Sequence, residues 1–148
     1  MSVVKGDKEE KFVVSGSVSG VCIVWDVKEA DLVRRFSIAD FESSITDLFI
    51  QDESKLLAIG SEEGKMCIYN LYTRELIKIL FHPDFMPINR LVLSLQPFGT
   101  LTFYSEMDGR LLIYSVNGQF LASKKFKGSK LTDLQVSTDA NNMDFIVS

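Results

Sequence analysis

The sequence predicts an all-β protein built from repeated four-stranded antiparallel sheets. Short runs rich in Val, Ile, Leu, Phe and Tyr alternate with turn residues, and no run of ten or more residues has helical periodicity. One unit of about 44 residues recurs along the chain. Four strand-forming runs within a unit of about 40–45 residues are typical of a propeller blade.

The repeat is clearest in a turn glycine that is followed five residues later by an aromatic residue. This pair occurs three times, as Gly20 with Trp25, Gly64 with Tyr69, and Gly109 with Tyr114, with the glycines 44 and 45 residues apart. Two further sets repeat between these pairs: Ile45, Ile88 and Leu131 at a spacing of 43, and Leu32, Leu76 and Phe120 at a spacing of 44. A period maintained by three independent sets indicates stacked copies of one structural unit.

The elements follow in order from this period. We expect a short tail over residues 1–10, repeats over about 11–43, 44–87 and 88–130, and the start of another repeat over 131–148. The apolar run Val21–Trp25 is typical of an inner strand that is covered on both faces. Charged side chains mark the outermost strand of each copy, where they discourage pairing with another sheet. They are Arg34, Arg35, Lys78, Lys124 and Lys125.

Residues 11–148 resemble the WD40 repeat family. The first copy, SGSVSGVCIVWD, ends on Trp25-Asp26 like the family's usual motif, and the later copies replace this dipeptide with Tyr69-Asn70 and Tyr114-Ser115. The resemblance implies a partial WD40 β-propeller of about three four-stranded antiparallel blades. The ring would be incomplete, because seven blades of this length need about 300 residues.

WD40 blades often contain a hydrogen-bonded set of His, Asp, Ser or Thr, and Trp. By this resemblance Ser15 and Trp25 match the Ser and Trp positions, while Ser19 stands where Asp is usual. His82 and Asp108 match the other two positions in the third repeat. We expect their side chains to lie within about 3.5 Å of each other, in a structural role.

A further resemblance lies in Ile113–Phe126 and the following LTDLQVS, which are similar to propeller repeats at the C-terminal end of BEACH-domain, neurobeachin-like proteins. In that family the propeller is a docking surface for proteins of vesicle traffic and autophagy. The resemblance therefore implies a scaffold in membrane trafficking.

The residue patterns of catalysis are absent. The chain has one histidine and two cysteines, Cys22 and Cys67, which lie too far apart for a CxxC motif. It has no GxxxxGK[ST] loop and no GxSxG elbow. We therefore expect no enzyme activity, no cofactor and no metal site.

The charge and hydropathy of the chain argue against some classes of partner and location. The net charge of −4 and the pI of about 5.0 argue against a nucleic-acid binder. The sequence contains no apolar run of membrane-spanning length and no signal peptide. We expect a cytoplasmic protein with free, buried thiols.

The chain is thus expected to bind other proteins. Phe41 and Phe85-Met86, in the loops 38–44 and 82–88, are the candidate partner-binding anchors, with inward packing as the alternative. A fragment of a propeller enzyme remains a second reading. Peripheral phosphoinositide binding is a third, although Val33–Phe36 lacks the final glycine of the Arg-Arg-Gly motif. Unpaired edges of an incomplete ring would also favour self-association.

Overall fold

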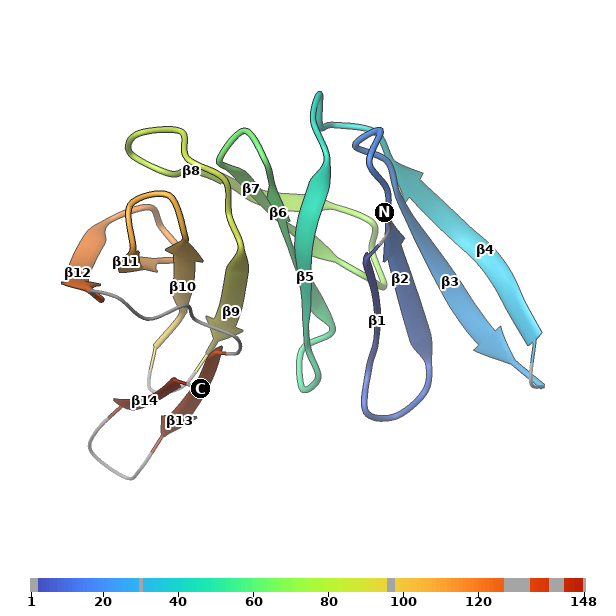
Figure 1. Cartoon of the computed structure of the whole chain (residues 1–148). Helices are drawn as coiled ribbons and strands as arrows, with labels where there is room; N and C mark the ends of the chain where they lie inside the picture. Colours follow the sequence, from blue (N-terminus) through green and yellow to red (C-terminus); the bar gives the residue numbers. More distant parts are fainter. Residues whose placement is uncertain (1–2, 30, 96–97, 127–133, 139–142, 148) are drawn as a thin grey trace.

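The computed structural model describes residues 3–29, 31–95, 98–126, 134–138 and 143–147, the last two ranges as backbone. These residues form three four-stranded antiparallel sheets and one two-stranded sheet, and the three large sheets stand side by side in chain order (Figure 1). The prediction of an all-β partial propeller with about three antiparallel blades is confirmed. The described residues contain no helix of the length and apolarity that a membrane crossing would require.

Each blade takes its strands in sequence order from one edge to the other. The first blade contains β1 (Val3–Gly6), β2 (Phe12–Gly16), β3 (Cys22–Lys28) and β4 (Asp31–Ile38). The second contains β5 (Ile45–Gln51), β6 (Leu56–Ser61), β7 (Lys65–Asn70) and β8 (Leu76–Phe81). The third contains β9 (Arg90–Ser94), β10 (Thr100–Ser105), β11 (Arg110–Ser115) and β12 (Phe120–Lys125). The two-stranded sheet pairs β13 (Leu134–Thr138) with β14 (Met143–Val147), and β13 lies beside β9.

The prediction of a short N-terminal tail over residues 1–10 is wrong. Val3–Gly6 form β1, which pairs along β2 from Val3 opposite Gly16 to Gly6 opposite Val13. The sequence signal for this strand is short because the polar run Asp7–Lys11 follows at once. Only the neighbouring β2 provides the hydrogen-bond partners that make these four residues a strand.

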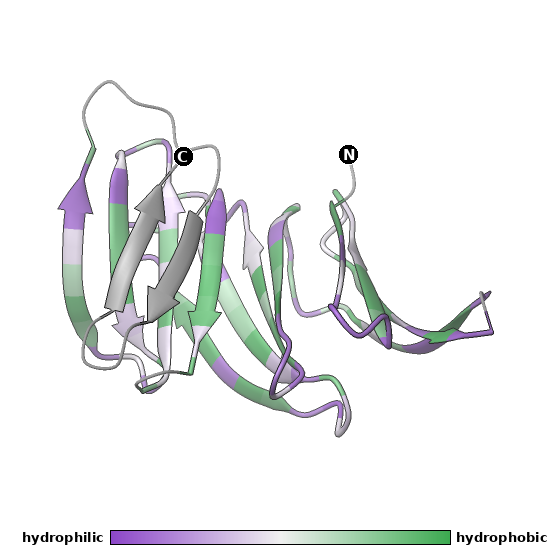
Figure 2. Cartoon of the chain, turned by 90° about the horizontal axis from the view of Figure 1, so that it is seen from below, coloured by the Kyte–Doolittle hydropathy of each residue, from purple (hydrophilic) through white to green (hydrophobic). Residues whose placement is uncertain are grey.

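The core lies between the blades. Successive side chains of a strand point to opposite faces, so the middle blade buries two apolar sets. One set packs against the first blade and includes Leu57, Ile59, Cys67, Tyr69 and Leu71. The other packs against the third blade and includes Ala58, Met66, Ile68 and Leu80. Figure 2 shows hydrophobic stretches within the inner strands and hydrophilic residues at many of the strand ends.

The two cysteines lie in this core as free, buried thiols, as expected. Burial raises the pKa of Cys22 and of Cys67 to about 12. Both side chains therefore act as small apolar core groups rather than as reactive thiolates.

The same irregularity recurs at the repeat aromatic of each blade. The pairing of the third strand with the fourth shifts register at Val24/Trp25, at Ile68/Tyr69 and at Ile113/Tyr114. A bulge increases the local twist of a strand. The outer part of each blade is thus turned relative to the inner part at the same place in every repeat.

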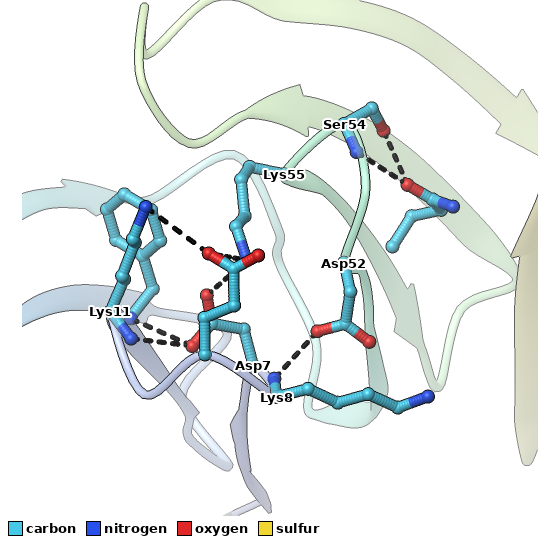
Figure 3. Close-up of polar contacts among 9 residues, drawn as sticks. Asp7, Lys8, Lys11, Asp52, Ser54 and Lys55 are labelled. Carbon is cyan, nitrogen blue, oxygen red and sulfur yellow. Dashed lines mark hydrogen bonds and ion pairs between the residues drawn. The ribbon is translucent and has the colours of Figure 1, made fainter.

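A buried ion pair joins the first two blades at the end opposite the β2–β3 turn (Figure 3). Lys55 Nζ lies 2.7 Å from Asp7 Oδ2, with side-chain exposures of 4% and 0%. The other Asp7 carboxylate oxygen accepts the backbone N–H groups of Lys11 and Phe12. Although burial raises the pKa of Asp7, the hydrogen bond from Lys55 and these two N–H groups outweigh it and hold the pKa below its usual range.

Candidate protein-interaction surface

Among the described residues, five connections gather at one end of the three blades, because alternate connections of an up-and-down sheet return to the same end. They are the β2–β3 turn (17–21), the β4–β5 loop (39–44), the β6–β7 turn (62–64), the β8–β9 loop (82–89) and the β10–β11 turn (106–109). We call this set the top face, since it lies toward the top of Figure 1.

Backbone hydrogen bonds hold the top face together across blade boundaries. Ile45 N–H donates to Ser17 O at 3.0 Å, and Ile88 N–H donates to Ser61 O at the same distance. Each bond ties a loop between blades to the turn of the blade before it. Loops held in this way form a rigid surface rather than a set of independent tips.

The repeat glycines make these close approaches possible. Gly20, Gly64 and Gly109 all have positive φ, at 87°, 84° and 65°. A Cβ on Gly64 would lie 2.8–2.9 Å from backbone atoms of Phe85 and Met86. The turn glycine of one blade is thus the surface on which the following loop rests.

His82 and Asp108 meet as expected, with Nε2 3.4 Å from the carboxylate oxygen Oδ2. Asp84 N–H donates to His82 Nδ1 at 3.0 Å, so the neutral ring carries its proton on Nε2, the atom that faces Asp108. The contact is an electrostatic one, since it does not meet the geometry of a hydrogen bond. Burial lowers the pKa of His82, and the ring is neutral in the folded chain.

Arg110 completes this cluster. Its guanidinium donates to Asp108 at 2.8 Å and to Asp84 at 2.7 Å. Burial raises the pKa of Asp108, but the backbone and guanidinium hydrogen bonds from Arg110 outweigh it and lower the pKa overall. The cluster therefore ties the β8–β9 loop to the β10–β11 turn.

The same cluster has the composition of a metal site, because His82, Asp84 and Asp108 bring ligand atoms within 4.8 Å of one another. The guanidinium of Arg110, however, already binds both carboxylates. A second cation there would face this fixed positive charge. We assign the cluster a structural role in shaping the loop.

The remaining repeat residues also make structural contacts. Trp25 Nε1 donates to Ser15 Oγ at 3.2 Å, and the Asp26 carboxylate lies 3.4 Å from Arg35. The Tyr69 hydroxyl donates to the Asp40 carboxylate, and burial raises the pKa of that hydroxyl, which keeps it protonated. Tyr114 packs against Phe103 in the core between the second and third blades.

The two loop phenylalanines, Phe41 and Phe85, differ in burial. Phe41 is 5% exposed and belongs to the core between the first two blades, so its assignment as a partner-binding anchor was wrong. The ammonium of Lys65 lies 5.4 Å from the centre of its ring. Phe85, at the matching place in the next repeat, is 64% exposed, and Met86 is half-buried.

Phe85 is also in a strained backbone conformation. Its φ is 55°, the left-handed region that bulky residues avoid. It packs edge-on against Phe81, with ring centres 5.9 Å apart, and both rings are exposed. An exposed aromatic held in a strained conformation by its surroundings is typical of a binding position.

The arginines considered for lipid binding have other contacts. Arg35 donates to the backbone oxygens of Leu71 and Tyr72, both at 2.9 Å, and so bridges the first two blades. The guanidinium of Arg34 lies 5.8 Å from the Trp25 ring. These contacts give both arginines a structural role in the first blade.

Sequence reasoning missed three exposed apolar side chains on or beside the top face: Val18, Phe81 and Met107. It also missed the sign of the charge there, since the five connections contain no Lys or Arg. Counting the charges in each loop of the sequence would have predicted this acidic character, once the loops that lie at the same end of the blades were known.

Comparisons with known proteins point to repeats of the WD type. BEACH domain-containing protein B of Arabidopsis thaliana is 26% identical over 149 aligned positions that cover 86% of this chain. WD repeat-containing protein 55 homolog of Drosophila willistoni is 29% identical over 68 positions, or 46% of this chain. No protein-family model matches the chain. Together with the blade arrangement, these similarities support repeats of the WD40 type.

The solved structures add to the assignment of the fold. The crystal structure of the computationally designed Ika8 protein matches with a TM-score of 0.68 and 20% identity over 91% of this chain, a similarity that shows the fold alone. The chain spans 39% of that structure's chain, and only 6% and 13% of the two curated relatives.

Proposed function

We propose that this chain is part of a WD40-type scaffold that binds another protein through its top face. The observation that supports this most is the contrast between Phe41 and Phe85, which occupy matching places in consecutive repeats. One is buried in the core and the other is exposed on a rigid loop. Aromatic side chains presented in this way are common anchors of protein interfaces.

The surroundings of Phe85 favour binding over catalysis. The one histidine nearby is buried, neutral and occupied in fixing the loop. The names of the two curated relatives fit a non-enzymatic scaffold. The chain is proposed to act in the cytoplasm, and the similarity to a BEACH domain-containing protein supports a role in membrane trafficking, with any membrane association made through its protein partner.

Photo-crosslinking tests the binding role. A benzoylphenylalanine introduced at Phe85 in the chain, expressed in cells of its source organism, should give discrete crosslinked adducts with one or a few proteins. The control carries the same crosslinker at Val33, an exposed residue of the outer strand β4. Adducts from position 33 that equal those from position 85, or no adducts from position 85, would contradict the proposal.

A further inference from the structure

We propose that the partner segment recognised by the top face is basic and carries an apolar anchor side chain. This inference rests on the proposed function and names the chemistry of the partner. The five connections of the top face contain seven carboxylates and no Lys or Arg. The carboxylates are those of Asp40, Glu42, Glu62, Glu63, Asp84, Glu106 and Asp108.

Three cations that begin strands at the edge of the top face already make contacts within the chain. Lys65, which begins β7, donates to Asp40 O at 2.7 Å and lies over the Phe41 ring. Arg110, which begins β11, is bonded to Asp84 and Asp108. Arg90, at the start of β9, donates to a neighbouring backbone oxygen. Lys125 of β12 pairs with Arg110 and lies at the same edge, and the ammonium of Lys124 lies 5.5 Å from the centre of the Phe126 ring.

Two of the carboxylates are open to a partner. Glu42 and Glu62 are exposed, and within the described residues their carboxylates make no hydrogen bond or ion pair. They belong to adjacent loops, since Glu62 N–H donates to Ser44 O and Glu42 N–H donates to the Glu63 carboxylate. A cationic side chain placed between these loops would meet two uncompensated charges.

Apolar anchors accompany the acidic loops. Phe85, Met107 and Val18 are exposed at the same end of the blades, and Phe81 supports the Phe85 ring. Asp84 and Asp108, the neighbours of Phe85 and Met107 in the chain, share one guanidinium. The two exposed side chains therefore flank a common fixed point, as the anchors of a single docking site would.

The opposite end of the blades is different. Its loops mix Lys8, Lys11, Lys55 and Arg74 with carboxylates, and ion pairs such as Lys11 with Glu9 neutralise them locally (Figure 3). The acidic character is thus a property of one face rather than of the whole chain. Loops with an excess of negative charge attract basic protein segments and repel anionic lipid headgroups and nucleic acids.

Peptide binding tests this inference. The probe is a fluorescein-labelled decapeptide that alternates lysine with leucine and phenylalanine, and its anisotropy is measured with the whole chain at low and high salt. One control peptide replaces every lysine with glutamate, and a second replaces every apolar residue with glycine. We expect the first peptide to bind at least tenfold more tightly than either control, with affinity falling as salt rises.

Matched charge reversals locate the binding. Glu42→Lys with Glu62→Lys changes the top face, while Glu29→Lys with Glu53→Lys makes the same change in net charge at exposed residues of the opposite end. The top-face pair should weaken binding at least tenfold and the other pair less than twofold. Equal weakening by both pairs, or equal binding of the glutamate peptide, would overturn the inference.

Different experimental results would contradict the scaffold function and the basic partner segment. If position 85 crosslinks to a protein whose binding survives the reversal at Glu42 and Glu62, the basic partner is wrong and the scaffold function stands. If the peptide binds the top face but position 85 yields no adduct in cells, the scaffold function through this surface is wrong.

Discussion

At the residue scale, Phe85 combines a strained backbone conformation with an exposed aromatic ring. A bulky residue in the left-handed region costs about 1–2 kcal/mol, and burial usually offsets such a cost. The Phe85 ring gains only the contact with Phe81, because most of its surface faces solvent. A role in binding gives a reason for this residue that stability does not.

Replacing Phe85 with Asn should therefore separate stability from binding. Asn tolerates positive φ, so we expect Phe85→Asn to change the free energy of unfolding by less than about 1 kcal/mol, or to raise it. Crosslinking from a neighbouring probe at Met86 should fall sharply in the same variant. Urea denaturation and adduct yield are the two measurements, and a large loss of stability would show that Phe85 is instead a structural residue.

The buried pair Lys55 and Asp7 leads to a second prediction. Removing one partner leaves an uncompensated charge in the core, so Lys55→Met should lower the free energy of unfolding by about 3 kcal/mol in urea denaturation. The double variant Lys55→Met with Asp7→Asn should recover part of this loss, because an Asn oxygen still accepts the Lys11 and Phe12 N–H groups. A double variant less stable than the single one would contradict the pair's assigned role.

His82 makes stability depend on pH in a defined direction. Its folded pKa lies below the unfolded value of about 6.5, so the unfolded chain binds the proton more tightly. The contribution of His82 to the free energy of unfolding is fully present above pH 6.5. It is lost as the pH falls through the pKa of His82 in the folded chain. His82 is the chain's one histidine, so His82→Gln should flatten the loss of stability between pH 7 and pH 5, and an unchanged slope would refute the assignment.

At the element scale, each blade repeats one device in which a turn glycine of positive φ supports the loop to the next blade. Gly20 lies beneath Phe41 and Ser43, and Gly64 beneath Phe85 and Met86. The turn of each blade thus helps to fix the conformation of the loop that follows that blade. The device explains why the repeat keeps its glycine while the aromatic residue five positions later changes from Trp to Tyr.

Gly64→Ala should therefore be costly. The added Cβ would lie 2.8–2.9 Å from backbone atoms of the β8–β9 loop, at a φ of 84°, and we expect a loss of about 2 kcal/mol in the free energy of unfolding. Gly6→Ala is the matched control, because its Cβ would make only ordinary contacts at 3.7–3.8 Å. Thermal or urea melts that show equal effects for the two variants would contradict this account.

At the scale of the whole molecule, the blades stack with one face left open. Val13, Ile23, Trp25 and Val27 of the first blade are half-buried, whereas their repeat counterparts in the second blade are packed against the first blade. Those counterparts are Leu57, Cys67, Tyr69 and Leu71. A cavity of about 300 Å³ lies at one end of this open face, between Gly6, Phe12 and Leu32.

We expect the isolated chain to self-associate through this apolar face. Ile23→Lys with Val27→Lys should reduce the concentration dependence of its sedimentation coefficient. Ile77→Lys, at an exposed position of β8, is the control and should leave self-association unchanged. A monomer at all concentrations, or an equal effect of the control, would contradict the expectation.

The sequence by itself determined the repeat, the four-stranded blade and the direction in which blades stack. These follow from spacing and alternation, which depend on backbone geometry that every copy shares. The meeting of His82 with Asp108 was predicted from the resemblance to WD40 blades, whose hydrogen-bonded set has a His and an Asp at these positions. Sequence reasoning failed at Val3–Gly6, where four residues become a strand only through pairing with β2.

Only the tertiary structure decided which side chains are accessible. Phe41 and Phe85 occupy matching places, each directly after an Asp, yet one is buried between the blades and the other is exposed. Burial depends on residues far away in the sequence, such as Lys65 and Gly20 around Phe41. The gathering of seven carboxylates on one face likewise arises only when alternate loops are brought to the same end of the blades.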